Sequence, residues 1–333
     1  MSIQGSVLYL SDGNKIRKIS GGVITAVAGS TTASFSGDGA AATSAYLNTP
    51  NSCSFSSIGE MYIADTNNYR IRKINTLGNI LSVTGTSTTA DSEDTASLST
   101  ATITAPKMVQ VVGDTPFVLD STRLFKLENN AKTLVYTAGF VGMYESNTGP
   151  KSYSGIIKAI QVSKGGEAYV SEYTTTMGRI RKVTRSSIAT IVGTGLPGYS
   201  GDLGQGTVAK VNQASGLYVV NGDVYFADVA SHKVRKFTGA SGVVFNLMGT
   251  GVAGSTLDGN VASSSKINSA YSVAIASNGD IYFSDTGNHV VRKITFTNGI
   301  VYTFAGSLQS GSYSGDSGQA TSATLNSPRG MHS

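Results

Sequence analysis

The chain has 333 residues, with 25 Lys and Arg, 20 Asp and Glu, 40 Gly, 16 Tyr, 11 Phe, one Cys and a net charge of +5. The single cysteine, Cys53, excludes an intrachain disulfide and a CxxC metal motif, and we expect it to be a buried thiol. No apolar run approaches the ~18 residues that a membrane-spanning helix needs, and residues 1–4 carry no basic region of a signal peptide.

One sequence pattern recurs along the whole chain. Its clearest copy is MYIADTNNYRIRKI, residues 61–74, in which an apolar run ends in an acid and a polar turn leads into alternating basic and aliphatic residues. The acids that anchor the copies are spaced by 52 to 57 residues and are Asp12, Asp65, Asp120, Glu172, Asp228 and Asp285. A period of this size predicts one supersecondary unit repeated in an array.

Each unit predicts the same elements in the same order, and the second unit shows them best. A loop at 35–39 and a stretch of small residues precede Pro50, after which we expect an inner strand. The strand 61–64, the polar turn 65–68, the basic strand 69–75 and the outer strand 80–84 follow. Six units of four antiparallel strands predict an all-β, six-bladed β-propeller that forms a single domain over residues 1–333.

The chain ends predict that the ring closes. The residues after Asp285 and those up to Asp12 together number 60, close to one more period. Leu325-Asn326-Ser327-Pro328 also matches Leu47-Asn48-Thr49-Pro50. We therefore expect the N- and C-terminal strands to pair in one blade, which would leave no exposed strand edge.

These units resemble the NHL repeat. The resemblance rests on SGDGxxAxxAxLxxP, then on the motif that ends in D-x-x-N-x-R-[IV]-R-K, and it covers the entire chain. It implies a propeller but no single function, because NHL propellers include RNA binders, protein-interaction platforms, extracellular sensor domains and a few lyases. The lyases use several histidines for zinc, with a catalytic tyrosine and arginine, whereas this chain has only His232, His289 and His332.

The distribution of positive charge argues against a nucleic-acid partner. Sixteen of the 25 Lys and Arg fall in the six basic runs, which a ring would spread around its circumference. Several others gather instead, at Lys107, Lys132, Lys151, Lys158, Lys164 and Arg185.

An arginine follows most anchor acids across the turn, and we interpret each acid as paired with an arginine of its own or the next blade in a structural ion pair that sets the register between blades. A charge on a packed blade face should be paired and hydrogen-bonded. The pairs are Asp12 with Arg17, Asp65 with Arg72, Glu172 with Arg181, Asp228 with Arg235, and Asp285 with Arg292. Phe125 takes the arginine's place in the third unit, so Asp120 should have another partner or a more exposed site.

The D-x-x-N turns and the loops between blades should lie on one face, where we expect function. Aromatic residues beside carboxylates in these loops could bind sugars or cationic side chains, or could simply pack between blades above a Gly-Asp turn. The candidate ligand-binding residues are Phe35, Asp38, Tyr144, Glu145, Lys151, Tyr199, Asp202, Tyr313 and Asp316. The loops at 87–105 and 139–155 differ most from the others, which favours a ligand near them.

The sequence therefore predicts a monomeric, non-catalytic binding module for a protein or glycan, with no cofactor or metal. A further alternative is a propeller that serves as a spacer in a larger extracellular protein, and the sequence itself indicates no compartment. The alternative is a metal-dependent lyase or hydrolase with its site at the mouth of the central channel. The repeated candidates there are Asn48, Asn212, Asn268 and Asn326, although such residues often satisfy backbone groups in a turn.

Overall fold

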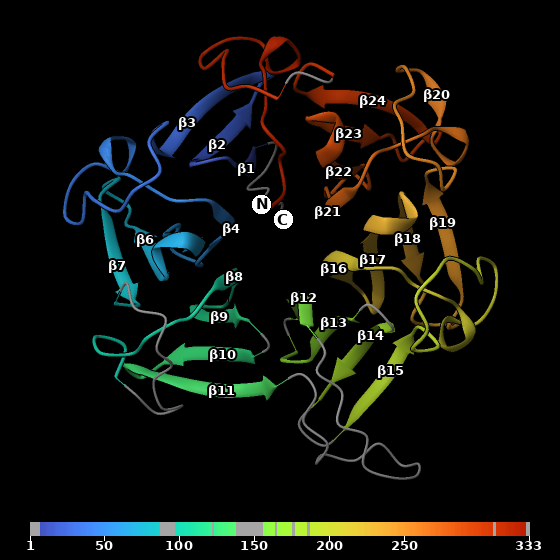
Figure 1. Ribbon diagram of the computed structural model, residues 1–333, viewed down its shortest axis with the longest axis horizontal. Helices are drawn as coiled ribbons and strands as arrows, with labels where there is room; N and C mark the ends of the chain where they lie inside the picture. Colours follow the sequence, from blue (N-terminus) through green and yellow to red (C-terminus); the bar gives the residue numbers. More distant parts are fainter. Residues whose placement is uncertain are drawn as a thin grey trace.

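The fold is an all-β, six-bladed propeller (Figure 1). A computed structural model describes residues 7–86, 97–121, 123–137, 156–163, 165–174, 177–184, 187–308 and 311–330. In these ranges, helix is limited to short 3-10 turns, and no helix has the length and apolar character that a membrane crossing requires.

The six sheets follow one another in chain order around a central axis (Figure 1). Blade 1 holds β1 (Leu8–Asp12), β2 (Lys15–Ser20) and β3 (Val23–Gly29). Blade 2 holds β4 (Pro50–Phe55), β5 (Met61–Asp65), β6 (Arg70–Ile74) and β7 (Ile80–Thr84). Blade 3 holds β8 (Pro106–Val112), β9 (Thr115–Asp120), β10 (Arg123–Glu128) and β11 (Ala131–Thr137).

The other three blades have the same antiparallel order, with one addition. Blade 4 holds β12 (Ile156–Val162), β13 (Ala168–Thr174), β14 (Met177–Val183) and β15 (Ile188–Val192). Blade 5 holds β16 (Ala214–Val220), β17 (Asp223–Asp228), β18 (Lys233–Phe237) and β19 (Val244–Met248). Blade 6 holds β21 (Ala270–Ile275), β22 (Ile281–Asp285), β23 (Val290–Ile294) and β24 (Ile300–Ala305), and β20 (Asn260–Val261) from its entry loop pairs outside β24.

The prediction of four strands in every blade is therefore wrong for two of them. Blade 6 has five strands because β20 pairs with its outer edge, and blade 1 has three among the described residues. Pairing of N- and C-terminal strands in one blade is not seen in the described part of the chain and stays a prediction.

The apolar core lies between blades rather than inside one of them. Alternate residues of each strand face one neighbouring blade or the other, so both faces of a blade are buried. One cluster joins Ile16 and Ala28 of blade 1 to Leu47, Cys53 and Ile63 around blade 2, and Cys53 is fully buried as expected. Another joins blades 5, 6 and 1 and includes Leu325 of the C-terminal segment.

The two ends of the described chain meet at blade 1, which lies beside blade 6 (Figure 1). The backbone N–H of Asn326 donates to Asp12 Oδ1 at 2.8 Å, and Arg17 reaches Asp316 at 2.6 Å. Asn48, Asn212 and Asn268 make the same N–H bond to the acids of their own blades, at 2.7 to 2.8 Å. The C-terminal segment thus takes the position that precedes the inner strand in other blades.

Candidate ligand-binding face

Three of the turns that follow the anchor acids form near-identical 3-10 turns: η2 (Thr66–Asn68) and η6 (Thr286–Asn288), which have the D-x-x-N pattern, and η4 (Val229–Ser231), which ends in serine instead. In η2, Asn68 Nδ2 donates to Asp65 Oδ2 at 2.8 Å and to the carbonyl of Ser34 at 2.8 Å. Asn288 makes the equivalent bonds to Asp285 and Gly254. The acid and the asparagine of the motif therefore hold the turn and the entry loop together.

A left-handed residue ends each of these turns: Tyr69 (φ 56°), His232 (φ 50°) and His289 (φ 61°). His232 Nδ1 accepts the N–H of Ser269, and His289 Nδ1 accepts the N–H of Ser327, both at 3.1 Å. Each histidine thus fixes the entry to the following blade. His332 lies outside the described residues, and in the ranges described no three His, Cys, Asp or Glu side chains are grouped as they would be to hold a metal.

The buried arginines form clamps that join a blade to the loop that enters it. Arg72 Nη1 lies 3.3 Å from Asp65, while Nη2 lies 2.6 Å from Asp38 and donates to the carbonyl of Ser36 at 3.0 Å. Arg17 makes the corresponding contacts to Asp12 and Asp316, and Arg235 makes them to Asp228 and Asp202. The acidic partners are in the arginine's own blade and in the loop that enters it.

Two clamps depart from the predicted pairing. Arg292 lies 3.2 Å from Asp258 of the entry loop, but no contact joins it to Asp285. Glu172 contacts Arg181 at 3.8 Å and Arg179 more closely, at 2.6 Å. Arg292 thus keeps only its entry-loop partner, while Glu172 lies closer to an arginine two residues before the predicted one.

Blade 3 replaces the clamp altogether. Asp120 is fully buried and accepts hydrogen bonds from Thr104 Oγ1 at 2.9 Å and from the N–H of Ala105 at 2.6 Å. The ring of Phe125 occupies the arginine's place, and the Lys132 ammonium lies 4.5 Å from its centroid. Asp120 therefore has another partner, one of the two outcomes anticipated from the sequence.

The predicted loop aromatics lie over these clamps. The Phe35 ring is 4.1 Å from the Arg70 guanidinium carbon and 4.7 Å from that of Arg72. Tyr199 lies over Lys233 and Arg235 and donates to Asp202, which with burial raises the pKa of Tyr199 to about 12. Tyr313 covers Gly13 and accepts a hydrogen bond from Asn326 Nδ2 at 3.2 Å. Tyr144, Glu145 and Lys151 lie outside the described residues.

The mouth of the central channel holds a second set of residues on the same face. In blades 2 to 6 a residue at or near the start of the inner strand pairs with the anchor acid, as Pro50 pairs with Asp65 and Pro106 with Asp120. Within the next two residues the ladder skips at least one residue as a β-bulge, and a bulge turns a side chain away from the sheet. We call these residues, together with the equivalent Arg329, the mouth ring: Asn51, Lys107, Lys158, Gly216, Tyr271 and Arg329.

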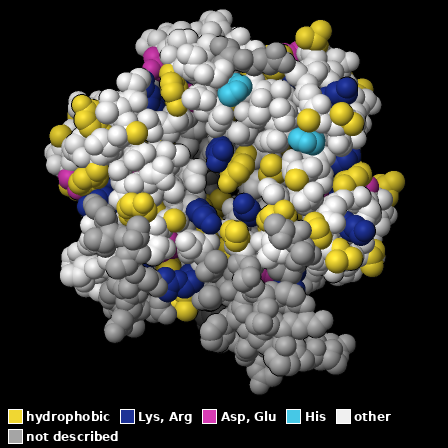
Figure 2. Space-filling model, viewed as in Figure 1, with side chains coloured by type: hydrophobic (Ala, Val, Ile, Leu, Met, Phe, Trp, Pro, Cys, Tyr) yellow, Lys and Arg dark blue, Asp and Glu magenta, His cyan; other side chains and the backbone are white. Residues whose placement is uncertain are grey.

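The mouth ring is cationic. Figure 2 shows Lys and Arg side chains around a hollow at the centre of this face, and the cavity there is lined by Lys107, Lys158 and Arg329 with no Asp or Glu. In the described chain no carboxylate lies within 4.0 Å of any of the three. Burial lowers the pKa of the Lys107 ammonium, and repulsion by Lys158 lowers it further, with Asp120 acting in the opposite direction.

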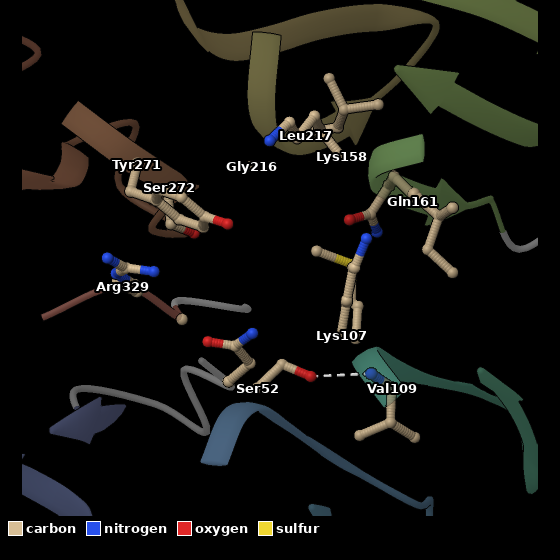
Figure 3. A pocket seen from close by; sticks show the side chains of 14 residues that line it. Ser52, Lys107, Val109, Lys158, Gln161, Gly216, Leu217, Tyr271, Ser272 and Arg329 are labelled. Atoms are coloured by element: carbon tan, nitrogen blue, oxygen red, sulfur yellow. Dashed lines mark hydrogen bonds between the residues drawn. The ribbon is translucent and has the colours of Figure 1, made fainter. Parts of the chain in front are cut away.

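Neutral hydrogen-bonding groups complete the cavity. In Figure 3, Lys107 and Gln161 point toward each other on one side, and Tyr271 lies beside Arg329 on the other. The Arg329 guanidinium carbon is 5.2 Å from the Tyr271 ring centroid, and burial raises the pKa of the Tyr271 phenol, so it remains a neutral donor. Gln161 is 7% exposed, and among the described residues its Oε1 has no hydrogen-bond partner.

A wider hollow of about 240 Å³ adjoins the mouth ring and shares Asn51 and Arg329 with it. Its other lining groups include the hydroxyl side chains of Ser11, Thr49 and Ser327 and the side chains of Tyr313 and Asn326. The predicted rim residue Tyr313 therefore borders the channel mouth.

Sequence reasoning included Lys107 and Lys158 only as part of a general cluster, and it missed Tyr271, Gln161 and Arg329 as site residues. A signal was present for some of them. Lys107 and Arg329 directly follow Pro106 and Pro328, as Asn51 follows Pro50, and the repeat places all of these at the start of an inner strand.

No protein-family model and no curated protein sequence matches the chain, so membership of the NHL family stays a prediction. Solved structures do match over nearly its full length. A Bacteroides thetaiotaomicron protein of unknown function is 17% identical, with a TM-score of 0.63 over 96% of this chain and 76% of its own. An auxiliary nutrient binding protein of the same organism is 13% identical, with a TM-score of 0.61 over 97% and 70%.

Two further structures extend the range of functions. A chain of the nidogen/laminin complex is 11% identical, with a TM-score of 0.57 over 98% of this chain and 96% of its own. Virginiamycin B lyase of Staphylococcus aureus is 14% identical, with a TM-score of 0.51 over 91% and 81%. At these identities the likeness shows a common fold, which serves both binding proteins and an enzyme.

Proposed function

We propose that the chain is a non-catalytic binding module for a glycan or protein ligand, which it holds on the face of the turns and entry loops, over the channel mouth. The observation that carries this proposal is the mouth ring. Half-buried cations are normally paired, yet Lys107 and Lys158 converge here with the more exposed Arg329, and no described carboxylate lies beside them. A ligand that supplied acceptor groups would complete the site.

The position of the ring in the fold supports this proposal. Lys107, Lys158 and Tyr271 come from inner strands packed between neighbouring blades, so their backbone is already in position before a ligand arrives, which reduces the ordering needed on binding. The exposed Phe35 and Tyr199 and the hollow beside Tyr313 extend the same face outward. The variable loops that contain Tyr144, Glu145 and Lys151 belong to this proposal as a second contact region.

The common fold also supports binding as the role. An auxiliary nutrient binding protein and a chain of the nidogen/laminin complex share it with this chain. We infer that this chain, too, uses its propeller as a preformed surface.

A direct screen tests the proposal. The purified chain is applied to a glycan array and to a panel of immobilised extracellular proteins, beside a Tyr144→Ala/Glu145→Ala/Lys151→Ala variant and a Lys107→Gln/Arg329→Gln variant. We expect a specific ligand whose retention falls in at least one variant. Retention of no probe would contradict a binding role, and one equivalent of zinc or calcium held through extensive dialysis would favour the metal-dependent enzyme instead.

A further inference from the structure

We propose that the mouth ring is a recognition site for the anionic group, carboxylate or sulfate, of an acidic carbohydrate. This inference rests on the binding function proposed above and names the class of ligand. Four features of the mouth ring and its surroundings support it.

The first feature is the way the backbone presents the ring. Lys107 and Lys158 are each skipped by the ladder that pairs the residues on either side of them. Tyr271 lies in the longer irregularity between Ala270 and Val273. β-Bulges are common beside active and binding sites because they re-aim one side chain without moving the strand. Successive blades thus direct their side chains to one axis.

The second feature is an excess of positive charge in a half-buried place. A cleft lined by charges of one sign concentrates the electrostatic potential and attracts the opposite ion. Lys107 and Lys158 repel one another, as the lowered pKa of Lys107 reflects, and neither has a carboxylate within 4.0 Å among the described residues. An anion between them and Arg329 would replace this repulsion by charge-assisted hydrogen bonds.

The third feature is an unused polar group in the same cavity. Gln161 is 7% exposed, lines the cavity and has a side-chain oxygen without a partner in the described structure. Buried polar atoms normally have a partner, so an orphan of this kind calls for one. The Gln161 oxygen accepts hydrogen bonds, so a hydroxyl group of the sugar that carries the anion would satisfy it, and the neutral Tyr271 phenol can donate to the anion itself.

The fourth feature is the shape of the site. The cavity at the ring measures about 30 Å³, room for about two water molecules, so only a small terminal group can enter it. The adjoining hollow of about 240 Å³ offers hydroxyl, amide and phenol groups that suit a sugar ring. An acidic peptide would gain little from this set, whereas a sugar acid fits both parts at once.

Calorimetry with a matched pair of ligands tests the inference. A galacturonate trimer and its fully methyl-esterified form differ only in charge, and a sulfated galactose trimer tests the second anion. We expect the two anionic trimers to bind and the ester to bind at least about tenfold more weakly, because charge-assisted bonds contribute roughly 1.5–3 kcal/mol each. Added salt should weaken the anionic trimers alone.

Variants locate the site. Lys107→Gln and Arg329→Gln should each weaken galacturonate binding about tenfold or more. Lys293→Gln is the matched control, because it removes one positive charge from β23, where Lys293 pairs with Asp280 outside the ring, and it should change affinity less than about twofold. Since Lys107 is repelled by Lys158, its substitution is not expected to unfold the protein, and a thermal melt verifies this.

The outcomes separate this inference from the function on which it rests. Equal affinity for acid and ester, no effect of the ring variants, or binding of polyglutamate in place of the uronide would overturn the anionic-sugar site, while a ligand found in the screen would still support a binding module. Release of an unsaturated uronate, seen by ultraviolet absorbance, would keep the site and overturn the non-catalytic role. Failure of every probe would overturn both.

Discussion

Arg72 shows how this fold tolerates a fully buried cation. Its guanidinium lies between Asp65 of its own blade and Asp38 of the entry loop, at 3.3 and 2.6 Å, and it also donates to the carbonyl of Ser36. Asp65 in turn accepts from Asn48 and Asn68. Nearly every charge-bearing atom at this point therefore has a partner, which is the condition under which a buried pair is stable.

Substitution of Arg72 by Met should leave Asp65 as a buried carboxylate without its cationic partner. We expect Arg72→Met to lower the free energy of unfolding by about 3–5 kcal/mol, measured by urea denaturation. Lys73→Met is the control on the same strand, because Lys73 pairs with Glu60 at a partly exposed site, and it should cost less than about 1 kcal/mol. Similar losses for both variants would mean that the clamp is no more than a surface pair.

The buried anchor acids should make stability depend on pH. Burial raises the pKa of Asp228 to about 7 and that of Asp285 to about 6, against hydrogen bonds and the neighbouring arginine, from an unfolded value of 3.8. The folded state binds these protons more tightly than the unfolded state does. The resulting stabilisation is complete below pH 3.8 and is lost as the pH rises through about 6 and about 7.

We therefore expect the free energy of unfolding to fall between about pH 6 and about pH 8, in urea titrations at several pH values. Asp228→Asn should flatten this slope because it removes the larger shift. Burial lowers the pKa of His232, which therefore changes stability with pH in the opposite direction. Both the unmodified protein and Asp228→Asn keep His232, so the difference between their slopes isolates the contribution of the Asp228 carboxyl. An unchanged slope in that variant would show that Asp228 stays ionised throughout.

At the scale of the strand, the ladder between the basic strand and the outer strand that follows it shifts at one equivalent position in all six blades. The shift falls at Arg17, Arg72, Phe125, Arg181, Arg235 and Arg292. A bulge bends the outer strand at the clamp, which lets the arginine reach the entry loop. The alternation of residues within each repeat predicts these strands. A β-bulge, however, requires no particular residue type, so neither the bulge at the clamp nor the bulge at the mouth ring could be predicted.

In the described chain a glycine with positive φ ends or follows the outer strand of every blade except blade 3, and a backbone carbonyl oxygen lies close to it. Gly249 has φ +100°, and a Cβ there would lie 2.2 Å from the carbonyl oxygen of His232. Gly259 has φ +87° but nothing within 4 Å. These two glycines share a backbone conformation and differ in their surroundings.

We expect Gly259→Ala to cost about 1–2 kcal/mol, the usual penalty for a left-handed alanine. Gly249→Ala should cost clearly more, because the backbone of the neighbouring strand must also move. Differential scanning calorimetry of both variants measures the two costs. Equal shifts in melting temperature would indicate that conformational strain, rather than the close contact, limits this position.

At the scale of the molecule, the cluster that joins blades 5, 6 and 1 replaces a covalent connection. Leu325 is fully buried in it, and Leu47 is its equivalent between blades 1 and 2, where the chain is continuous. Leu325→Ala and Leu47→Ala should each lower the free energy of unfolding by about 2–5 kcal/mol.

Hydrogen exchange should separate these two variants. Leu325→Ala is expected to speed exchange in β1–β3 and in residues 311–330 together, because only packing and hydrogen bonds hold this junction. Leu47→Ala should affect residues near the second blade alone. If exchange in blade 1 were unchanged by Leu325→Ala, the junction would be held by other contacts, such as those of Arg17 with Asp316.

Periodicity, the spacing of the anchor acids and the match between residues 47–50 and 325–328 were enough to predict a six-bladed propeller. The mouth ring was not accessible in the same way, because Lys107, Lys158, Tyr271 and Arg329 lie in different repeats. The common axis of the propeller brings these residues together. The repeat indicates that they occupy equivalent positions, but it does not indicate that their side chains converge on one cavity. The pairing of Arg292 with Asp258 rather than with Asp285 likewise depends on how the entry loop packs, which the repeat does not indicate.

Because each member of the mouth ring is carried by its own blade, the width of the ring is set by the number of blades and not by any loop. Loop insertions can change what surrounds the opening but cannot widen or narrow it. Only the length of the side chains can change the opening, for example if a shorter or longer cationic side chain replaced Lys107. The propeller thus holds the six positions of the mouth ring at a fixed spacing, and selectivity for different ligands would evolve by substitution at these positions.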